Sequence, residues 1–193
     1  MKLALVFFSV LTSLSLWFGT QAMTPDTCRG KPLSITLLPG PNMTGPSLPL
    51  RFGGTREFPR PPVNSFHSDS ARRLVIKNRV EFSNFWKQLT ARALPNSVPP
   101  LPEIDFSKEM VVVAAMGQRP SSGYFIVIDG ACEVDGRVDV FVSSLEDVSC
   151  AGVFPVVTYP ADAVRLPRTD LPIVFHETQL SCTQWQNQLQ RLK

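Results

Sequence analysis

Proline is the feature that most constrains what this chain can fold into. The 193 residues include 18 prolines, and nine of them lie between Pro25 and Pro62. Each proline removes a backbone donor and breaks the interior of a helix, which excludes a helical bundle. Because 44% of the residues are apolar, wholesale disorder is excluded as well. The composition therefore predicts a small domain rich in strands and turns.

The first 22 residues have the pattern of a secretory signal peptide. Lys2 supplies a positive charge, residues 3–18 are mostly apolar, and Ala22 ends a small-residue cleavage site. We therefore expect a secreted or periplasmic protein. Cys28 lies six residues beyond the expected cleavage site, so it is not the cysteine that a bacterial lipoprotein acylates. No later stretch is apolar enough to span a bilayer.

The mature chain is expected to contain one domain with additions at both ends. Residues 23–71 are rich in Pro and Gly and contain one alternating segment, residues 33–38. This region is either an arm that adds a strand to the domain or a flexible tether, and we favour the arm. The domain is expected over residues 72–176, followed by a polar tail over residues 177–193 that could form a short helix.

One helix and several strands are expected within the domain. Asn78 and Glu81 have the spacing of a capping box, and an aromatic face follows up to the predicted stop at Pro95. The apolar run 110–116 predicts a central strand buried on both faces, and Asp135-Gly136 predicts a hairpin turn. The other expected strands are 74–76, 124–128, 138–142, 154–159, 161–166 and 173–175, and prolines place the last three at edges or bends.

These elements predict an α+β fold that is mostly β. We expect a curled antiparallel sheet of about six or seven strands, a sandwich or open barrel, with the amphipathic helix packed on it. Because alternate residues of a strand face opposite sides, Val112 should contact a different layer from Val111 and Val113. The expected core comprises Phe82, Phe85, Trp86, Leu89, Val111, Val113, Phe125, Val127, Val140 and Val174.

Four cysteines follow the signal and predict two disulfides. Three pairings are possible. We favour Cys132 with Cys150, which would close a loop around the hairpin, and Cys28 with Cys182, which would join the arm to the tail. No Cys-x-x-Cys pair is present, which disfavours a zinc ribbon or a thioredoxin-type motif.

Residues that would carry out catalysis are not apparent. The net charge of +3 disfavours a nucleic-acid binder. His67 and His176 are expected at the surface, and Glu103 with Asp105 is explained by capping and turn formation. We therefore expect a non-enzymatic protein with no cofactor and no metal. The alternative is a small-ligand site between helix and sheet that uses Glu103, Asp105 or His176.

The loop between the two apolar strands is the most informative segment. Residues 117–124 start and end near glycines, Gly117 and Gly123, that would allow a tight exit and re-entry. Loops with polar and aromatic residues on a rigid sheet often bind partners. The other interpretation is an ordered turn with Tyr124 packed inward. The expected partner-binding residues are Gln118, Arg119, Pro120, Ser121, Ser122 and Tyr124.

The strand 105–113 and the loop 117–124, Gly-Gln-Arg-Pro-Ser-Ser-Gly-Tyr, resemble the PrcB C-terminal family. The helix region, Pro100 to Pro102, and residues 159–167 extend the likeness over about residues 72–176. The family's namesake is a protease-complex subunit that associates with a secreted protease and supports its stability and maturation. Here Ser-Ser replaces the more common Thr-Gly in the loop, and there is no lipobox.

The resemblance implies an exported accessory protein that binds another exported protein, such as a protease, through the 119–124 loop. It carries over no catalytic residues. A weaker likeness links Pro120, Ser121 or Ser122, Gly123 and Tyr124 to the inhibitory loop of chagasin-type cysteine-protease inhibitors. A protease-inhibitor module or a small-ligand binder is therefore the alternative, and the oligomeric state is left open.

Overall fold

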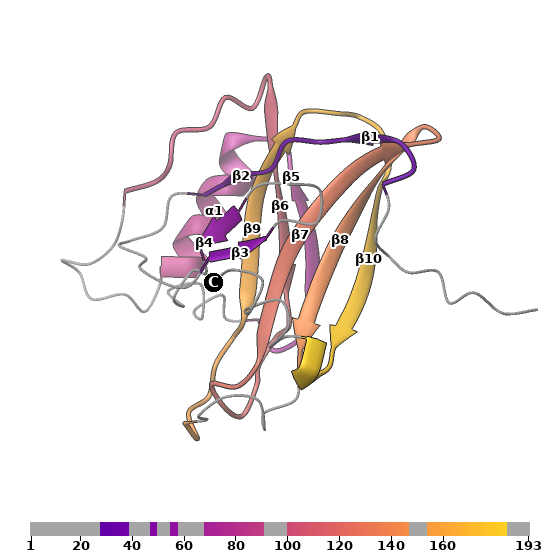
Figure 1. The fold of residues 1–193 in the computed structure, drawn as a ribbon. Helices are drawn as coiled ribbons and strands as arrows, with labels where there is room; N and C mark the ends of the chain where they lie inside the picture. Colours follow the sequence, from indigo (N-terminus) through magenta and orange to yellow (C-terminus); the bar gives the residue numbers. More distant parts are fainter. Residues whose placement is uncertain are drawn as a thin grey trace, which may run out of the picture.

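The computed structural model describes residues 28–38, 47–49, 55–57, 68–90, 100–146 and 154–184. They form two packed sheets with one helix on the outer face of one of them (Figure 1). The predicted signal peptide lies outside the described residues. None of the helices in the described part is long and apolar enough to cross a membrane.

The two main sheets have four strands each. Sheet A has the order β1-β7-β8-β10, and sheet B has the order β2-β9-β6-β5. A separate two-stranded pair is formed by β3 and β4. The elements are β1 (Lys31–Pro32), β2 (Thr36–Leu37), β3 (Ser47–Pro49), β4 (Thr55–Glu57), β5 (Arg72–Ile76), α1 (Arg79–Thr90), β6 (Glu109–Ala115), β7 (Phe125–Val134), β8 (Arg137–Leu145), β9 (Ala161–Pro167) and β10 (Ile173–Leu180).

This architecture confirms the expected mostly β fold with one packed helix. The arrangement is a sandwich rather than a closed barrel. All pairings are antiparallel except that of β8 with β10, which is parallel. β9 is central in sheet B because it pairs with both β2 and β6, so of the two alternatives expected for it, an edge or a bend, the edge position was wrong. Its only proline within the strand, Pro167, is the last residue, where a missing donor matters least.

Helix α1 begins as the sequence predicts. Asn78 Oδ1 accepts the backbone N–H of Glu81 at 2.9 Å, and the Glu81 carboxylate accepts the N–H of Lys77 at 3.4 Å. The first bond is that of an N-cap, and the two together form a variant of the capping box in which Glu81 bonds the residue before Asn78 rather than Asn78 itself. The aromatic face of the helix is buried on sheet B through Phe82, Phe85, Trp86 and Leu89. The predicted stop at Pro95 lies outside the described residues.

Strand β6 separates two hydrophobic layers. Val111 and Val113 pack in the layer under α1, whereas Val112 packs between the two sheets, as the alternation predicts. Most of the expected core is buried, but Val174 is 36% exposed and that prediction was wrong. On β10 it is Ile173 and Phe175 that pack against the inner layer, so Val174 faces outward. Phe125 is half-buried at the start of β7.

The described part of the arm crosses from one sheet to the other. The arm adds a strand within the expected range 33–38, since β2 pairs with β9, but it also adds a second strand that was not expected, β1, which pairs with β7. The approach at β1 is close, and a Cβ on Gly30 would clash with the carbonyl oxygen of Glu133. Glycine therefore allows the arm to contact the end of β7.

This crossing determines the disulfide that the structure describes. Cys28 is bonded to Cys132, with Cα atoms 5.8 Å apart, so both favoured pairings were wrong. The physical reason is the β1–β7 register, which places Pro32 opposite Cys132 and brings the start of the arm to that strand. Cys182 is also disulfide-bonded, and its partner lies outside the described residues.

Three further expectations concern turns and strand ends. The hairpin at Asp135-Gly136 is confirmed, with both residues at positive φ between Val134 and Arg137. Strand β10 runs to Leu180, beyond the expected strand end at residue 175 and the expected domain end at residue 176, and residues 182–184 form a helical turn. The expected strand over residues 154–159 was wrong. Only Thr158 and Tyr159 have bridge geometry there, and Pro155 interrupts the run.

Candidate functional site

Two loops meet at one end of the sandwich. The first, residues 117–124, joins β6 to β7, and the second, residues 154–160, leads into β9. In Figure 1 both lie at the lower end of the sheets, away from β1. We call them together the paired-loop tip.

Backbone bonds hold the two loops side by side. Arg119 and Thr158 exchange both N–H···O bonds, at 2.8 and 2.9 Å, in an isolated antiparallel bridge. The N–H of Ser122 donates to the Phe154 carbonyl at 3.1 Å, and the Ser122 hydroxyl accepts the Phe154 N–H at 2.9 Å. Each loop therefore satisfies backbone groups of the other.

Gly117 makes the tight exit from β6 possible. Its φ is +78°, and a Cβ there would lie 2.7 Å from the backbone carbonyl carbon of Ser70. Both the torsion angle and the close approach require glycine. This confirms the expected role of Gly117, whereas Gly123 is not among the glycines at positive φ.

The expected binding residues differ in how much of each reaches solvent. Gln118 and Pro120 are exposed, whereas Arg119, Ser122 and Tyr124 are half-buried. Ser121 is buried beneath the second loop, where its carbonyl accepts the Thr158 hydroxyl at 2.7 Å. Ser121 therefore holds the two loops together rather than facing outward.

Arg119 is held in place within the tip. Its guanidinium carbon lies 5.6 Å from the centroid of the Tyr124 ring, a cation–π distance. One guanidinium nitrogen lies 3.8 Å from the Glu146 carboxylate, and another donates to the Gln118 carbonyl at 3.1 Å. Tyr124 also packs against the layer between the sheets, so its ring connects the tip to the core.

The sequence analysis missed the apolar surface of the tip. Phe154, Val156 and Val157 are 71%, 52% and 52% exposed, and Pro155 between them is exposed as well. The N–H of Val156 donates to the Phe154 carbonyl at 2.8 Å, which fixes a tight turn at Pro155. Pro155 was the available signal, because a proline inside an apolar run argues against a paired strand.

The residues of the alternative small-ligand site do not come together. Asp105 caps a turn, accepting the Ser107 N–H at 3.0 Å and pairing with Lys108 at 3.1 Å. These bonds, that of the Ser107 side chain first, lower the pKa of Asp105. The next residue, Phe106, packs in the layer under α1, whereas His176 is on β10 of sheet A. Glu103 is exposed, and His67 lies outside the described residues.

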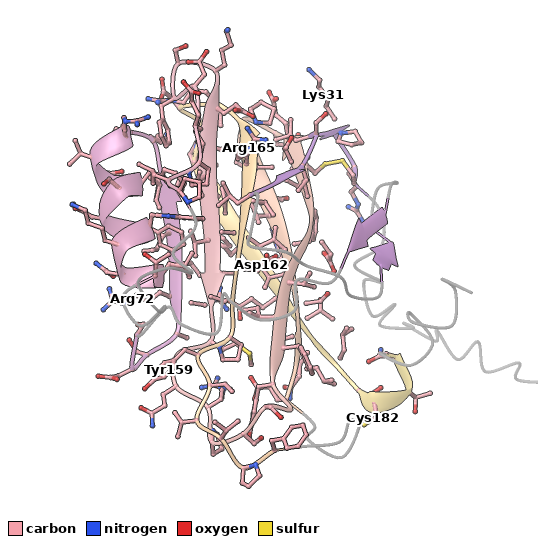
Figure 2. All side chains as sticks on the ribbon, turned by 90° about the vertical axis from the view of Figure 1, so that its left-hand side faces the viewer. Lys31, Arg72, Tyr159, Asp162, Arg165 and Cys182 are labelled. Atoms are coloured by element: carbon pink, nitrogen blue, oxygen red, sulfur yellow. A yellow bond between two sulfur atoms is a disulfide. The ribbon has the colours of Figure 1, made fainter. Side chains whose placement is uncertain are left out.

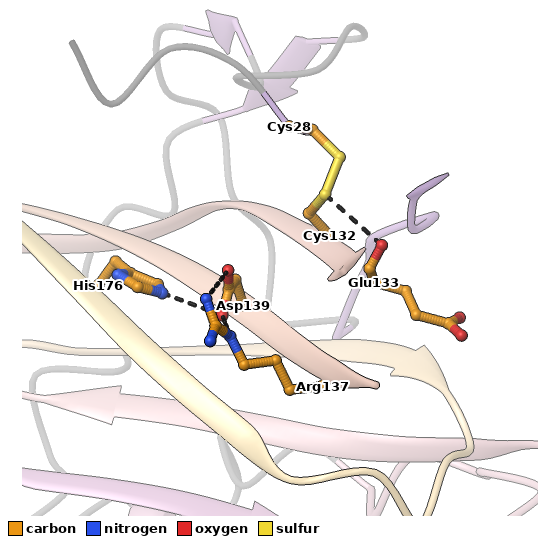
Figure 3. Close-up of a disulfide and its surroundings, with 6 residues drawn as sticks. All are labelled: Cys28, Cys132, Glu133, Arg137, Asp139 and His176. Carbon is orange, nitrogen blue, oxygen red and sulfur yellow. Dashed lines mark hydrogen bonds and ion pairs between the residues drawn. A yellow bond between two sulfur atoms is a disulfide. The ribbon is translucent and has the colours of Figure 1, made fainter. Parts of the chain in front are cut away.

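His176 belongs instead to a small polar cluster near the disulfide (Figure 3). Its Nε2 lies 3.0 Å from Asp139 Oδ1, and the Arg137 Nε lies 2.7 Å from the same oxygen. The ring stacks on Phe141 with centroids 5.4 Å apart. Burial alone would raise the pKa of Asp139, but hydrogen bonds from Arg137 and His176 outweigh it and lower that pKa.

No group of three or more His, Cys, Asp or Glu side chains within the described ranges has a geometry suited to a metal ion. The described part of the molecule is a β-sandwich with an ordered pair of loops at one end, and these loops have an exposed apolar surface. This combination is typical of domains that present loops on a rigid sheet.

The comparison with protein families agrees with the sequence analysis. Residues 110–167 match the family described as PrcB C-terminal. The matched segment runs from β6 to β9 and includes both loops of the tip, so the predicted resemblance to this family is confirmed for this part of the chain. The matched range, residues 110–167, is shorter than the expected range 72–176 and does not include α1. No curated protein and no solved structure matches the chain.

Proposed function

We propose that this protein is an exported, non-enzymatic accessory protein that binds a partner protein through the paired-loop tip. The observation that carries this proposal is the run of four exposed residues from Phe154 to Val157 on an ordered loop. Contiguous exposed apolar side chains on a folded domain mark interaction sites. Because the loop is already fixed by backbone bonds, little conformational entropy is lost on binding.

The partner is a component of a protease complex. The family match over residues 110–167 supports this assignment, since the family takes its name from a protease-complex subunit. The tip falls within the matched segment. The partner surface is expected to be concave and apolar, to receive the projecting Phe154, with a polar rim beside Gln118 and Arg119.

The proposal is tested by recovery of the partner from the medium or periplasm of the producing cell. Tagged protein carrying Phe154→Ser and Val157→Ser is compared with the wild type and with Val80→Ser. Val80 is the matched control, because it is 72% exposed and lies on α1 rather than at the tip. Thermal unfolding verifies that the wild type and both variants are folded.

We expect wild type and Val80→Ser to recover a protease-complex protein, identified by mass spectrometry, and the tip variant to lose it. Arg119→Ala with Tyr124→Ala should reduce recovery as well. Equal recovery by all variants would refute the tip assignment. A recovered protease that is inhibited rather than stabilised would instead favour the inhibitor alternative.

A further inference from the structure

A second surface, separate from the tip, lies along the open side of β5. This strand is the last in sheet B, and within the described residues it pairs with β6 alone. The free side of such a strand presents a row of backbone N–H and C=O groups. A groove of about 780 Å³ follows this edge between β5 and α1.

The wall of the groove on the helix side is a regular stripe. Glu81, Asn84, Phe85 and Gln88 line it at the i, i+3, i+4 and i+7 spacing of one helix face. Three of these side chains are polar and exposed, whereas Phe85 is buried beneath them. An extended segment lying on β5 would therefore meet one carboxylate and two amide groups.

The two arginines of β5 leave its edge open. Charged side chains commonly protect edge strands from pairing with other chains. Here the Arg73 guanidinium pairs with Glu177 of β10 in sheet A at 2.8 Å. It also donates to the carbonyls of Ala115 in β6 and of Arg72 in β5 itself, both at 2.7 Å. Arg72 donates from Nε to the Ser68 hydroxyl at 2.9 Å. Each arginine is therefore held by its own chain rather than across the edge.

Opposite charges mark the two ends of the groove. Arg72 is the first residue of β5, and Figure 2 shows it below the helix, at the end of the strand away from the capping box. Glu81 lies at the other end, where its carboxylate accepts the N–H of Lys77. No ion pair joins Arg72 or Glu81 to another described residue. Asp69 and Arg73 also line the groove near Arg72, so this end carries one net positive charge and the Glu81 end carries one negative charge.

We propose that this groove binds an extended segment of a partner protein as an added strand on β5. The segment carries a basic side chain facing Glu81 and an acidic side chain facing Arg72. Residues four apart on a strand point to the same face and lie about 14 Å apart. This spacing matches the length of β5, from Arg72 to Ile76. Backbone pairing would supply affinity, and the two charges would fix the register and direction.

The probes are synthetic seven-residue peptides with blocked ends. Thr-Lys-Val-Thr-Val-Glu-Thr carries the two charges four residues apart, and its reversed sequence tests the opposite direction. A third peptide has Gln in place of both charges. Binding is measured by fluorescence anisotropy and by hydrogen exchange of the β5 amides. One charged direction should bind at least about tenfold more tightly than the other two peptides. It should also protect amides of residues 72–76 from exchange.

Two helix variants separate the groove from the rest of the surface. Asn84→Trp places a bulky ring in the groove and should abolish peptide binding. Lys87→Trp is the matched control, an exposed position of the same helix that does not line the groove. It should bind the peptide as the wild type does.

Any of three results would overturn the proposal. The first is that the three peptides bind equally well or that no peptide binds. The second is that the bound peptide protects amides outside β5, and not those of β5, from hydrogen exchange. The third is that Asn84→Trp still binds the peptide. Dimerisation in sedimentation runs that Asn84→Trp abolishes would show that a second copy fills the groove instead. The tip variant Phe154→Ser with Val157→Ser should bind the peptide normally, so this proposal and the proposed function fail independently.

Discussion

Cys28 is bonded to Cys132 across a sequence separation of 104 residues, which ties the start of the described arm to β7. The same contact is supported by the β1–β7 pairing and by the close approach of Gly30 to Glu133. The arm is thus joined to sheet A by one covalent and several backbone contacts. Through β2 it then reaches sheet B.

Removing this disulfide should destabilise the protein substantially. Cross-linking residues that are about 100 positions apart stabilises a fold by about 2–5 kcal/mol, mostly by restricting the unfolded chain. We expect Cys28→Ala with Cys132→Ala to lose a free energy of unfolding in this range, measured by urea denaturation. The same pair of substitutions should increase hydrogen exchange at residues 31–37. A loss below about 1 kcal/mol would show that the arm is held by its strands alone.

The Asp139 cluster should make stability depend on pH. Asp139 has a lowered pKa and a side chain that is 10% exposed, between Arg137 and His176. A carboxyl group with a lowered folded pKa stabilises the fold above its ordinary pKa of about 3.9. This stabilisation is lost as the pH falls through the lower folded value.

Asp139→Asn should therefore cost about 1–3 kcal/mol at pH 7, because Arg137 and His176 lose the negative charge of their acceptor and one of its two oxygens becomes a donor. The difference from wild type should shrink as the pH falls below 4, and urea denaturation at several pH values measures it. Asp135→Asn, at the exposed hairpin turn, is the control and should change stability little. A difference for Asp139→Asn that is independent of pH would contradict the account.

Comparing alanine substitutions at Gly117 and Gly136 distinguishes the cost of a left-handed torsion angle from the cost of a steric clash. Both have positive φ, +78° and +73°, but only Gly117 would place a Cβ against neighbouring backbone. Gly136→Ala should cost about 1–2 kcal/mol, for the left-handed torsion angle alone. Gly117→Ala should cost a further 1–3 kcal/mol or so, because the Ser70 backbone must shift. Equal costs in thermal unfolding would show that Gly117 is needed only for its torsion angle.

Thr158 tests whether the two loops of the tip depend on each other. Thr158→Val keeps the shape of the side chain but leaves the Ser121 carbonyl without its hydroxyl donor. A buried acceptor left unsatisfied costs about 1–3 kcal/mol. We expect faster hydrogen exchange at Arg119 and Ser122 and weaker partner recovery. Thr36→Val, at an exposed position of β2, is the control and should leave both unchanged.

The elements of this fold that depend on local sequence were predictable. The capping box at Asn78, the hairpin at Asp135-Gly136 and the two-sided burial of β6 all follow from residues close together in the chain. The disulfide was not predictable in the same way. Its partner choice depends on the pairing of β1 with β7 across about a hundred residues, and no local pattern specifies such a pairing.

The candidate site was predictable in part. The sequence indicated the first loop of the tip, because two apolar strands and Gly117 define where it must turn. It did not indicate the second loop, since an apolar run such as Phe154 to Val157 normally predicts a buried strand. β8 and β9 belong to different sheets, and residues 154–160, which lead into β9, lie at the end of the sandwich against the first loop.

The proposed role of the tip is tested most directly by site-specific photocrosslinking in the producing cell. A photoreactive phenylalanine analogue is placed at Phe154, and the same analogue at Val80 serves as the exposed control. We predict that irradiation joins the Phe154 variant to a protease-complex protein and that the Val80 variant gives no such product. If the protease-complex protein were crosslinked to the Val80 variant but not to the Phe154 variant, the central claim that the tip is the binding surface would be contradicted.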